Sequence, residues 1–159
     1  MVAQGFVTCL WFDGKAEEAA NFYTSVFKDS KLGRIGHYPE GAPGPAGSVM
    51  VVEFEANGYK FVGLNGGPQF TFNEAVSLQV MCDDQDEVDY YWAKLTEGGE
   101  EGPCGWLKDR YGLSWQVIPA AAVDLWSDEN PEKAQRAFEA MMTMRKLDLA
   151  ALQAAYDGV

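Results

Sequence analysis

Gln116, near the end of the segment CGWLKDRYGLSWQV, is the residue whose type and position suggest chemistry most directly. The segment predicts two short strands joined by a turn, in which Lys108–Tyr111 are expected to be solvated. Strand alternation puts Trp115 and Gln116 on opposite faces, and we expect Trp115 against a helix and Gln116 facing inward. An amide can hydrogen-bond a neutral ligand, whereas alone it would hold a metal ion only weakly. A polar residue satisfied inside the fold is the alternative interpretation.

The candidate nucleophiles are three cysteines, Cys9, Cys82 and Cys104. Their odd number and the lack of a CxxC pair are typical of free thiols in a reducing cytoplasm. His37 is the only histidine, and it lies in a loop-like context. No second histidine exists that could serve as a base for a cysteine nucleophile. We therefore favour buried structural cysteines over a catalytic one.

Glu53 and Glu55 could form an acid–base pair, since residues two apart share one face of a strand. An exposed sheet face is the simpler interpretation of the same spacing. The sequence contains no G-x-S-x-G element and no phosphate-binding loop. It also lacks a glycine-rich strand-to-helix turn that could hold S-adenosylmethionine. The residues alone therefore define no reaction.

The charge balance excludes some partners. Lys and Arg number 12 against 24 Asp and Glu, which gives a net charge of −12. Nucleic acids and anionic membranes bind clustered positive residues, so neither is an expected partner.

The start, MVAQGFVTCLWF, does not resemble a signal peptide, and no apolar run approaches the roughly 18 residues of a membrane span. We expect a cytoplasmic protein.

The elements that must position these residues follow the order strand, helix, strand, strand, strand. Asp13 is the expected N-cap of the helix, and the Gly/Pro-rich residues 40–47 are expected to be a loop or flap. Hydrophobic periodicity predicts strands at 6–12, 33–39, 48–55 and 59–65 and a helix at 15–27.

The same order recurs in the second half, with strands at 75–82, 103–107 and 113–118 and a helix after Asp83. Aligning the two helices places Tyr23 on Trp92, and aligning the last strands places Gly58 on Gly112. Two such copies can bury a sheet face that one copy would expose. The predicted fold class is α+β: two βαβββ modules forming a curved, mostly antiparallel sheet around a cleft, plus C-terminal helices.

The tail is expected to be helical. Ser127 or Asp128 could cap a helix that begins near Pro131, and Asp148 could cap a last helix. An apolar patch of Phe138, Met141 and Met142 either packs on its own domain or forms a dimer contact. We predict a domain at 1–122, with modules at about 5–67 and 74–119, and a helical extension at 123–159.

Several segments occur in an order that resembles a known family. They are LWFDGKAEEAANFYTSVF, EGAPGPAGSVMVVEFEANG, LNGGP, EAVSLQV and CGWLKDRYGLSWQVIP. Together they resemble the PhnB-like branch of the vicinal oxygen chelate superfamily, which carries the label 3-demethylubiquinone-9 3-methyltransferase. The superfamily includes glyoxalase I, bleomycin-resistance proteins, fosfomycin-resistance enzymes and extradiol dioxygenases. The resemblance covers nearly the whole chain and implies paired βαβββ modules.

In metal-using members of this superfamily each module supplies two ligands. The resemblance places the corresponding positions at Phe6, Val62, Val76 and Gln116. Phe and Val cannot donate to a metal. A shifted alignment would offer Thr8, Ser77 or Asn65, which still adds no carboxylate or imidazole. We therefore expect no metal and no cofactor.

The candidate ligand-binding residues are aromatic, amide and thiol side chains, namely Trp11, Asn65, Gln79, Cys104, Trp106 and Gln116. Core, turn and edge positions are their structural alternatives. An aromatic cleft with a few amides suits a small hydrophobic or aromatic molecule. We predict a non-metal small-molecule-binding protein that forms a homodimer. The alternative is an enzyme of the superfamily, either a methyltransferase as the label implies or a metal-dependent lyase, isomerase or dioxygenase.

Overall fold

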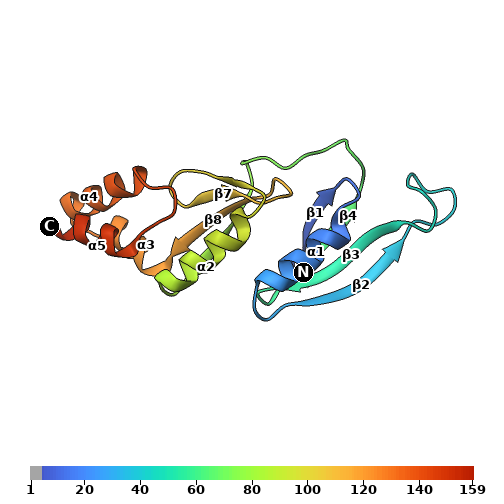
Figure 1. Cartoon of the computed structure of the whole chain (residues 1–159), viewed down its shortest axis with the longest axis horizontal. Coiled ribbons are helices and arrows are strands. Elements are labelled where there is room, and N and C mark those ends of the chain that lie inside the picture. Colours follow the sequence, from blue (N-terminus) through green and yellow to red (C-terminus); the bar gives the residue numbers. More distant parts are fainter. Residues whose placement is uncertain (1–4) are drawn as a thin grey trace. The chain divides into compact units, whose positions relative to one another are not determined.

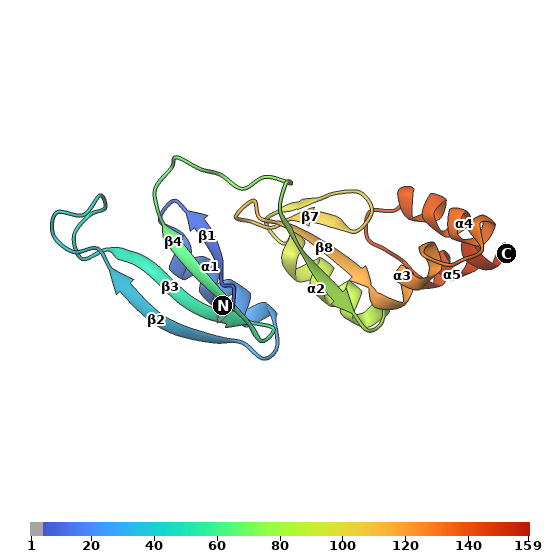
Figure 2. The same ribbon diagram turned by 180° about the vertical axis from the view of Figure 1, so that it is seen from behind.

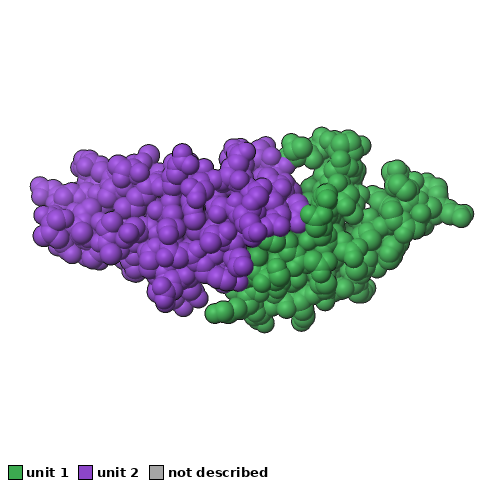
Figure 3. Space-filling model, in the orientation of Figure 1, with its two compact units in different colours: residues 1–71 green, residues 72–159 purple. Residues whose placement is uncertain are grey.

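The computed structural model describes residues 5–159, which form two compact units (Figure 3). The first unit ends at Thr71, and the second comprises Phe72–Val159. Each unit contains one four-stranded sheet and its own helices. Among the described helices, none has both the length and the apolar character needed to cross a bilayer.

The first unit has the predicted order of elements (Figure 1). They are β1 (Thr8–Phe12), α1 (Ala16–Val26), β2 (Lys31–His37), β3 (Val49–Ala56) and β4 (Tyr59–Asn65). The sheet order is β1-β4-β3-β2, in which β1 and β4 are parallel and the other neighbours are antiparallel.

The second unit repeats this arrangement, which confirms the predicted duplication. Its elements are β5 (Ser77–Cys82), α2 (Gln85–Thr96), β6 (Glu100–Glu101), β7 (Trp106–Lys108), β8 (Ser114–Pro119), α3 (Ala120–Trp126), α4 (Pro131–Met142) and α5 (Leu149–Asp157). The order β5-β8-β7-β6 again contains one parallel pair, β5 with β8. Two mixed βαβββ sheets and C-terminal helices confirm the α+β class, while a cleft shared by both modules stays a prediction.

A single helix covers one face of each sheet, as both ribbon views show (Figures 1 and 2). In the first unit Tyr23 of α1 is 1% exposed and stacks on Phe54, with ring centroids 6.0 Å apart. In the second unit Val88 and Leu95 of α2 are fully buried. These buried positions form one apolar stripe on each helix, in line with the hydrophobic periodicity that predicted a helix in each module. We call the side of each sheet that faces away from this helix, α1 or α2, its open face.

Two helix N-termini differ from the sequence prediction. Helix α1 is not capped by Asp13: its N-cap is Lys15, which makes no side-chain cap bond. Instead, Asn65 at the end of β4 accepts a hydrogen bond from Ala16 N at 2.8 Å. Helix α4 is capped by Asn130 rather than by Ser127 or Asp128. A tertiary contact can thus replace a local cap, because any correctly placed oxygen satisfies the free N–H.

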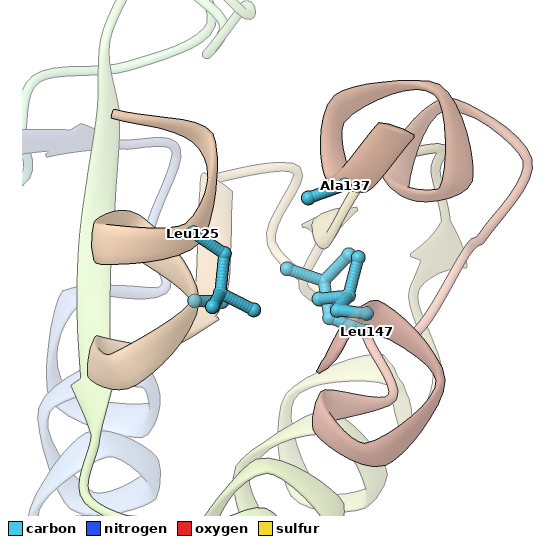
Figure 4. Close-up of a cluster of buried hydrophobic side chains, with 5 residues drawn as sticks. Leu125, Ala137 and Leu147 are labelled. Atoms are coloured by element: carbon cyan, nitrogen blue, oxygen red, sulfur yellow. The ribbon is translucent and has the colours of Figure 1, made fainter. Parts of the chain in front are cut away.

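The C-terminal helices bury a small core of their own (Figure 4). Leu125 of α3, Ala137 of α4 and Leu147 of the α4–α5 loop meet there, together with Ala122 and Leu152. Met141 packs against this core, whereas Phe138 and Met142 are 49% and 56% exposed. The predicted apolar patch of Phe138, Met141 and Met142 is therefore divided between the interior and the surface. Asp148 caps α5 as predicted, by accepting from Ala151 N.

Candidate functional site

Strand β8 separates its side chains between the two faces of the second sheet. Trp115 is 5% exposed and donates its Nε1–H to Asp109 Oδ2 at 2.8 Å. Gln116 is half-buried and lies on the open face, opposite Trp106 of β7 and beside Gln79 of β5. The orientation expected from strand alternation is therefore the one observed.

Neutral polar side chains form a connected row on this open face. Gln116 Nε2 donates to Ser77 Oγ at 2.8 Å, and Gln79 Nε2 lies 3.4 Å from Gln116 Oε1. Gln79 is exposed to solvent. The row can donate to and accept from a bound molecule without adding charge.

Trp106 joins this row to a cavity of about 430 Å³ in the second unit. The cavity is lined by Glu74, Glu100, Glu101, Gly102, Pro103, Trp106, Leu107, Lys108 and Ser114. Lys108 donates to Glu74, and this hydrogen bond raises the pKa of Lys108 and lowers the pKa of Glu74. The structure thus brings three of the six candidate residues together: Gln79, Trp106 and Gln116.

Asp109 corrects the expectation of a solvated turn at 108–111. Its side chain is 3% exposed and accepts from Tyr111 N, Leu113 N and Trp115 Nε1 at 2.8, 3.1 and 2.8 Å. A buried carboxylate is tolerated because these donors replace its hydration. Asp109 therefore shapes the turn that starts β8 and fixes the position of Trp115.

Trp11 and Asn65 belong to the first unit and already have partners there. Trp11 donates to Gly67 O at 2.8 Å, and its ring meets Phe70 edge-on with centroids 5.0 Å apart. Asn65 accepts from Ala16 N and donates to Val49 O at 3.0 Å, so both ends of its amide bond the backbone. These contacts hold the end of β4 to α1 and β3.

Cys104 lies in the loop before β7, because the strand predicted at 103–107 is observed at Trp106–Lys108. It has a left-handed backbone, with φ of 55°, and its Sγ lies 3.6 Å from Met142 Sδ. Its N–H donates to Met144 O at 2.8 Å. Cys104 therefore contacts the C-terminal segment, and it does not line the cavity beside Trp106.

The other two cysteines have contrasting environments. Cys82 is fully buried, and desolvation raises the pKa of its thiol to about 12. Cys9 is exposed on β1, so the expectation of buried cysteines is wrong for this residue. A buried thiol with so high a pKa is not a nucleophile near neutral pH.

Glu53 and Glu55 lie on one face of β3 as predicted, but cations neutralise both. Arg34 donates twice to Glu53, at 2.7 and 3.1 Å, and this hydrogen bonding lowers the pKa of Glu53. Lys31 lies 3.2 Å from Glu55. These pairs border a cavity of about 290 Å³ in the first unit. Because each carboxylate already has a cationic partner, the two are poorly placed to act as an acid–base pair on a substrate.

The positions that would hold a metal carry the wrong donors. Phe6 and Val76 are 100% and 68% exposed, and Val62 pairs with Cys9 on the open face of the first sheet. Across the described residues, no three His, Cys, Asp or Glu side chains gather in a group that could hold a metal ion. The amides and hydroxyls beside Gln116 are weak ligands for a divalent cation. Within each described unit, the side chains at these positions therefore offer no ligand set that fits a metal ion.

The candidate ligand-binding residues do not include Ser114, Glu100 or Ser77, although a shifted alignment offers Ser77 as a metal position. Ser114 and Gln116 are two apart, so strand alternation could have placed Ser114 on the same face. The same alternation relates Ser77 to Gln79 on β5, whereas its place opposite Ser114 follows only from the register of the parallel pair. Glu100 required knowledge of the short strand β6, which no periodic pattern marks.

Comparisons with known proteins agree with this fold. The family model described as 3-demethylubiquinone-9 3-methyltransferase matches residues 4–118. Among curated proteins, none matches the chain. A PhnB protein from Bacillus cereus is 40% identical, with a TM-score of 0.65, over 74% of this chain and 100% of its own. At the level of fold alone, the fosfomycin resistance protein FosX from Listeria monocytogenes, whose structure contains Mn(II) and sulfate, is 15% identical over 74% of this chain and 92% of its own, with a TM-score of 0.51.

Proposed function

The chain belongs to the 3-demethylubiquinone-9 3-methyltransferase family of PhnB-like proteins, and we propose that it binds a small planar molecule without using a metal. The proposed site is the open face of the second sheet, at Gln79, Trp106 and Gln116. The observation that carries the proposal is the hydrogen-bonded row of Gln79, Gln116 and Ser77 beside Trp106 and a cavity.

The neutral row supports binding rather than a metal-dependent reaction. The resemblance to the superfamily assigns Gln116 to a position where metal-using members have a ligand, and its Nε2 donates to Ser77 Oγ. The donors around it carry no charge, so they favour a neutral polar group of a ligand over a divalent cation. Bound substrate groups could hydrogen-bond Gln79 and Gln116 with little reorganisation, because both side chains are already oriented.

Trp106 supplies the apolar surface that such a ligand needs. It is half-buried, and it shares the open face with Gln116 and the cavity with Pro103 and Leu107. An indole ring offers a large flat contact area at small cost in conformational entropy. A flat molecule could therefore stack on Trp106 while its polar edge meets the amides.

The two strand-to-helix turns that precede α1 and α2 do not favour methyl transfer. The turn between β1 and α1 is Asp13-Gly14-Lys15, and the turn between β5 and α2 is Asp83-Asp84. Neither described turn is glycine-rich, which is what close approach of a nucleotide-like cofactor to a helix N-terminus requires. We therefore regard binding as the better-supported function for this chain.

The test is a thermal-shift screen with quinones, aromatic metabolites and antibiotics, repeated in EDTA. A ligand of the folded state raises Tm by mass action. We expect hits that persist in EDTA and that are lost in Gln116→Ala and Trp106→Leu. The matched control is Gln153→Ala, which removes an exposed helix amide that bonds only Asp157. Hits that disappear in EDTA, or that survive both site variants, would contradict the proposal.

We also propose that the protein forms a homodimer. Apolar side chains remain exposed on α4 and on the second sheet: Phe138, Met142 and Met81 are 49%, 56% and 48% exposed. Exposed methionine and aromatic groups of this kind adapt well to a partner surface. A second copy of the chain would bury them.

A further inference from the structure

A serine in the cavity of the second unit has an unused hydroxyl group. Ser114 is 0% exposed, yet its Oγ has no hydrogen-bond partner within the described structure. It lies on the open face of β8, between Lys108 of β7 and Ser77 of β5, and lines the cavity. A buried polar atom without a partner costs free energy, so native proteins rarely keep one without reason. A bound molecule that hydrogen-bonds Ser114 would remove this cost.

The side chains around Ser114 give the cavity a negative charge. Three glutamates, Glu74, Glu100 and Glu101, line it against one cation, Lys108, so the formal sum is −2. Lys108 is bound by Glu74. Glu101 accepts from Trp92 Nε1 at 3.0 Å and lies 3.9 Å from Arg145. Both of these carboxylates therefore already have partners.

Glu100 is the carboxylate that remains available. Its side chain is exposed and forms no ion pair among the described residues, although it attracts Lys108 electrostatically across the strand pair. On β6 it lies opposite Lys108, whose charge is already shared with Glu74. A positively charged group in the cavity would therefore meet an unpaired carboxylate, whereas an anion would have to displace Glu74 from Lys108.

Trp106 provides a flat electron-rich surface in the same cavity. The residue next to it on the neighbouring segment is Gly102, whose N–H donates to Trp106 O at 2.8 Å. A side chain on Gly102 would meet the Trp106 backbone, since a Cβ there would lie 2.9 Å from Trp106 O. The glycine therefore lets this segment pack closely against the Trp106 backbone, and Trp106 itself lines the cavity, where a cation can approach an indole face.

From these contacts we infer that the cavity binds a planar organic cation, a protonated amine attached to an aromatic ring. The ring lies against Trp106, the ammonium group faces Glu100, and a polar atom of the ligand bonds Ser114 Oγ. This inference rests on the proposed function, because it assigns a ligand class to the same open face. It adds Glu100 and Ser114 to the binding residues.

The experiment compares three probes of one shape that differ in charge: naphthalenemethylamine, naphthalenemethanol and naphthoic acid. Affinity is measured by quenching of tryptophan fluorescence. We expect the amine to bind about fivefold more tightly than the alcohol, and the acid most weakly. Equal affinities that still depend on Trp106 would overturn the cation inference and leave the proposed function standing. Binding of none of the probes would contradict both, and a preference for the acid would also overturn the inference.

Two variants locate the effect. Glu100→Gln should abolish the preference for the amine over the alcohol, while Glu129→Gln, another exposed carboxylate of the second unit, should retain it. Ser114→Ala should lower the amine affinity about threefold and leave Tm of the free protein unchanged or higher, because an unpartnered hydroxyl is removed. A lower Tm with unchanged affinity would show a purely structural role for Ser114. An unchanged preference in Glu100→Gln would overturn the assignment of the ammonium site.

Discussion

At the scale of single residues, the chemistry of this protein depends on what each polar side chain already bonds. The neutral amide of Asn65 suggested a binding residue. Its side chain instead accepts from Ala16 N at the start of α1 and donates to Val49 O of β3. Gln116 also has a partner, yet that partner is another side chain on the open face. Contacts of this kind connect residues far apart in the sequence, so residue type alone could not separate these two roles.

Asp109 gives a stability prediction at this scale. Its carboxylate accepts hydrogen bonds from two backbone N–H groups and from the Trp115 indole. Asp109→Ala removes the acceptor from all three and should lower the free energy of unfolding by about 2–4 kcal/mol, because buried donors lose their partner. Urea denaturation measures the effect, with Asp13→Ala, in an exposed turn, as the control. A loss no larger than that of the control would contradict the assigned role.

The cysteines give a prediction on reactivity. Burial raises the pKa of the Cys82 thiol to about 12, so near pH 8 this thiol stays protonated as well as shielded. Iodoacetamide should therefore modify Cys9 in the folded protein and reach Cys82 only after unfolding, because the thiolate is the reactive form. Peptide mass spectrometry measures the labelling of each site. Early labelling of Cys82 under native conditions would be inconsistent with its burial.

At the scale of elements, the periodic patterns predicted what local sequence determines. The apolar stripes of α1 and α2, the repeat and the alternation in β8 are all observed, because one buried face imposes each pattern. The cap of α1 and the short strand β6 could not be predicted, since both depend on tertiary contacts. The start of helix α3 was also not predicted. Pro119 is both the last residue of β8 and the N-cap of α3, so no loop separates the strand from the helix.

The C-terminal segment is attached to the second module by a strap, residues 144–149, that lies outside the family match at 4–118. Cys104 N and Gly105 N donate to Met144 O and Arg145 O. Gln85 bonds Leu147 O and Leu149 N at 3.1 and 2.9 Å. The strap thereby holds the loop that leads into Trp106.

We predict that Gln85→Ala loosens this strap. Two bonds between α2 and the strap are lost, so the free energy of unfolding should fall by about 1–3 kcal/mol. Limited proteolysis should then cut near the strap more readily than in the native protein. Gln135→Ala is the matched control, because that amide bonds only the exposed Glu139. Equal protection of the strap in both variants would contradict this account of how the extension is attached.

At the scale of the whole molecule, the duplication gives each unit a sheet with one face that its helix does not cover. Helices α1 and α2 each bury one side of their sheet, and in the second unit we propose that the other side binds a ligand. The sequence predicted the two modules from their repeated pattern. Their open faces became visible only through strand register, which pairs Ser77 with Ser114 and Trp106 with Gln116.

The proposed homodimer is testable at this scale. The native chain should sediment as a dimer at micromolar concentration, and the double variant Phe138→Ser with Met142→Ser should shift it toward monomer, because two exposed apolar contacts are lost. Sedimentation velocity measures the state, with Leu32→Ser, an exposed apolar residue of the first unit, as the comparison. A native monomer would exclude the dimer, and an unaffected dimer would exclude α4 as its contact.

The central claim is that the open face around Trp106 and Gln116 binds its ligand without a metal. The most direct measurement is an NMR titration of the ¹⁵N-labelled protein with the strongest thermal-shift hit, in the presence of EDTA. The five tryptophan indole signals are followed, with the signal of Trp106 assigned through Trp106→Phe. The account predicts that the Trp106 indole and the Gln116 side-chain amide shift most, and equally with or without EDTA. Shifts confined to Trp11, or shifts that vanish when metal is removed, would contradict it.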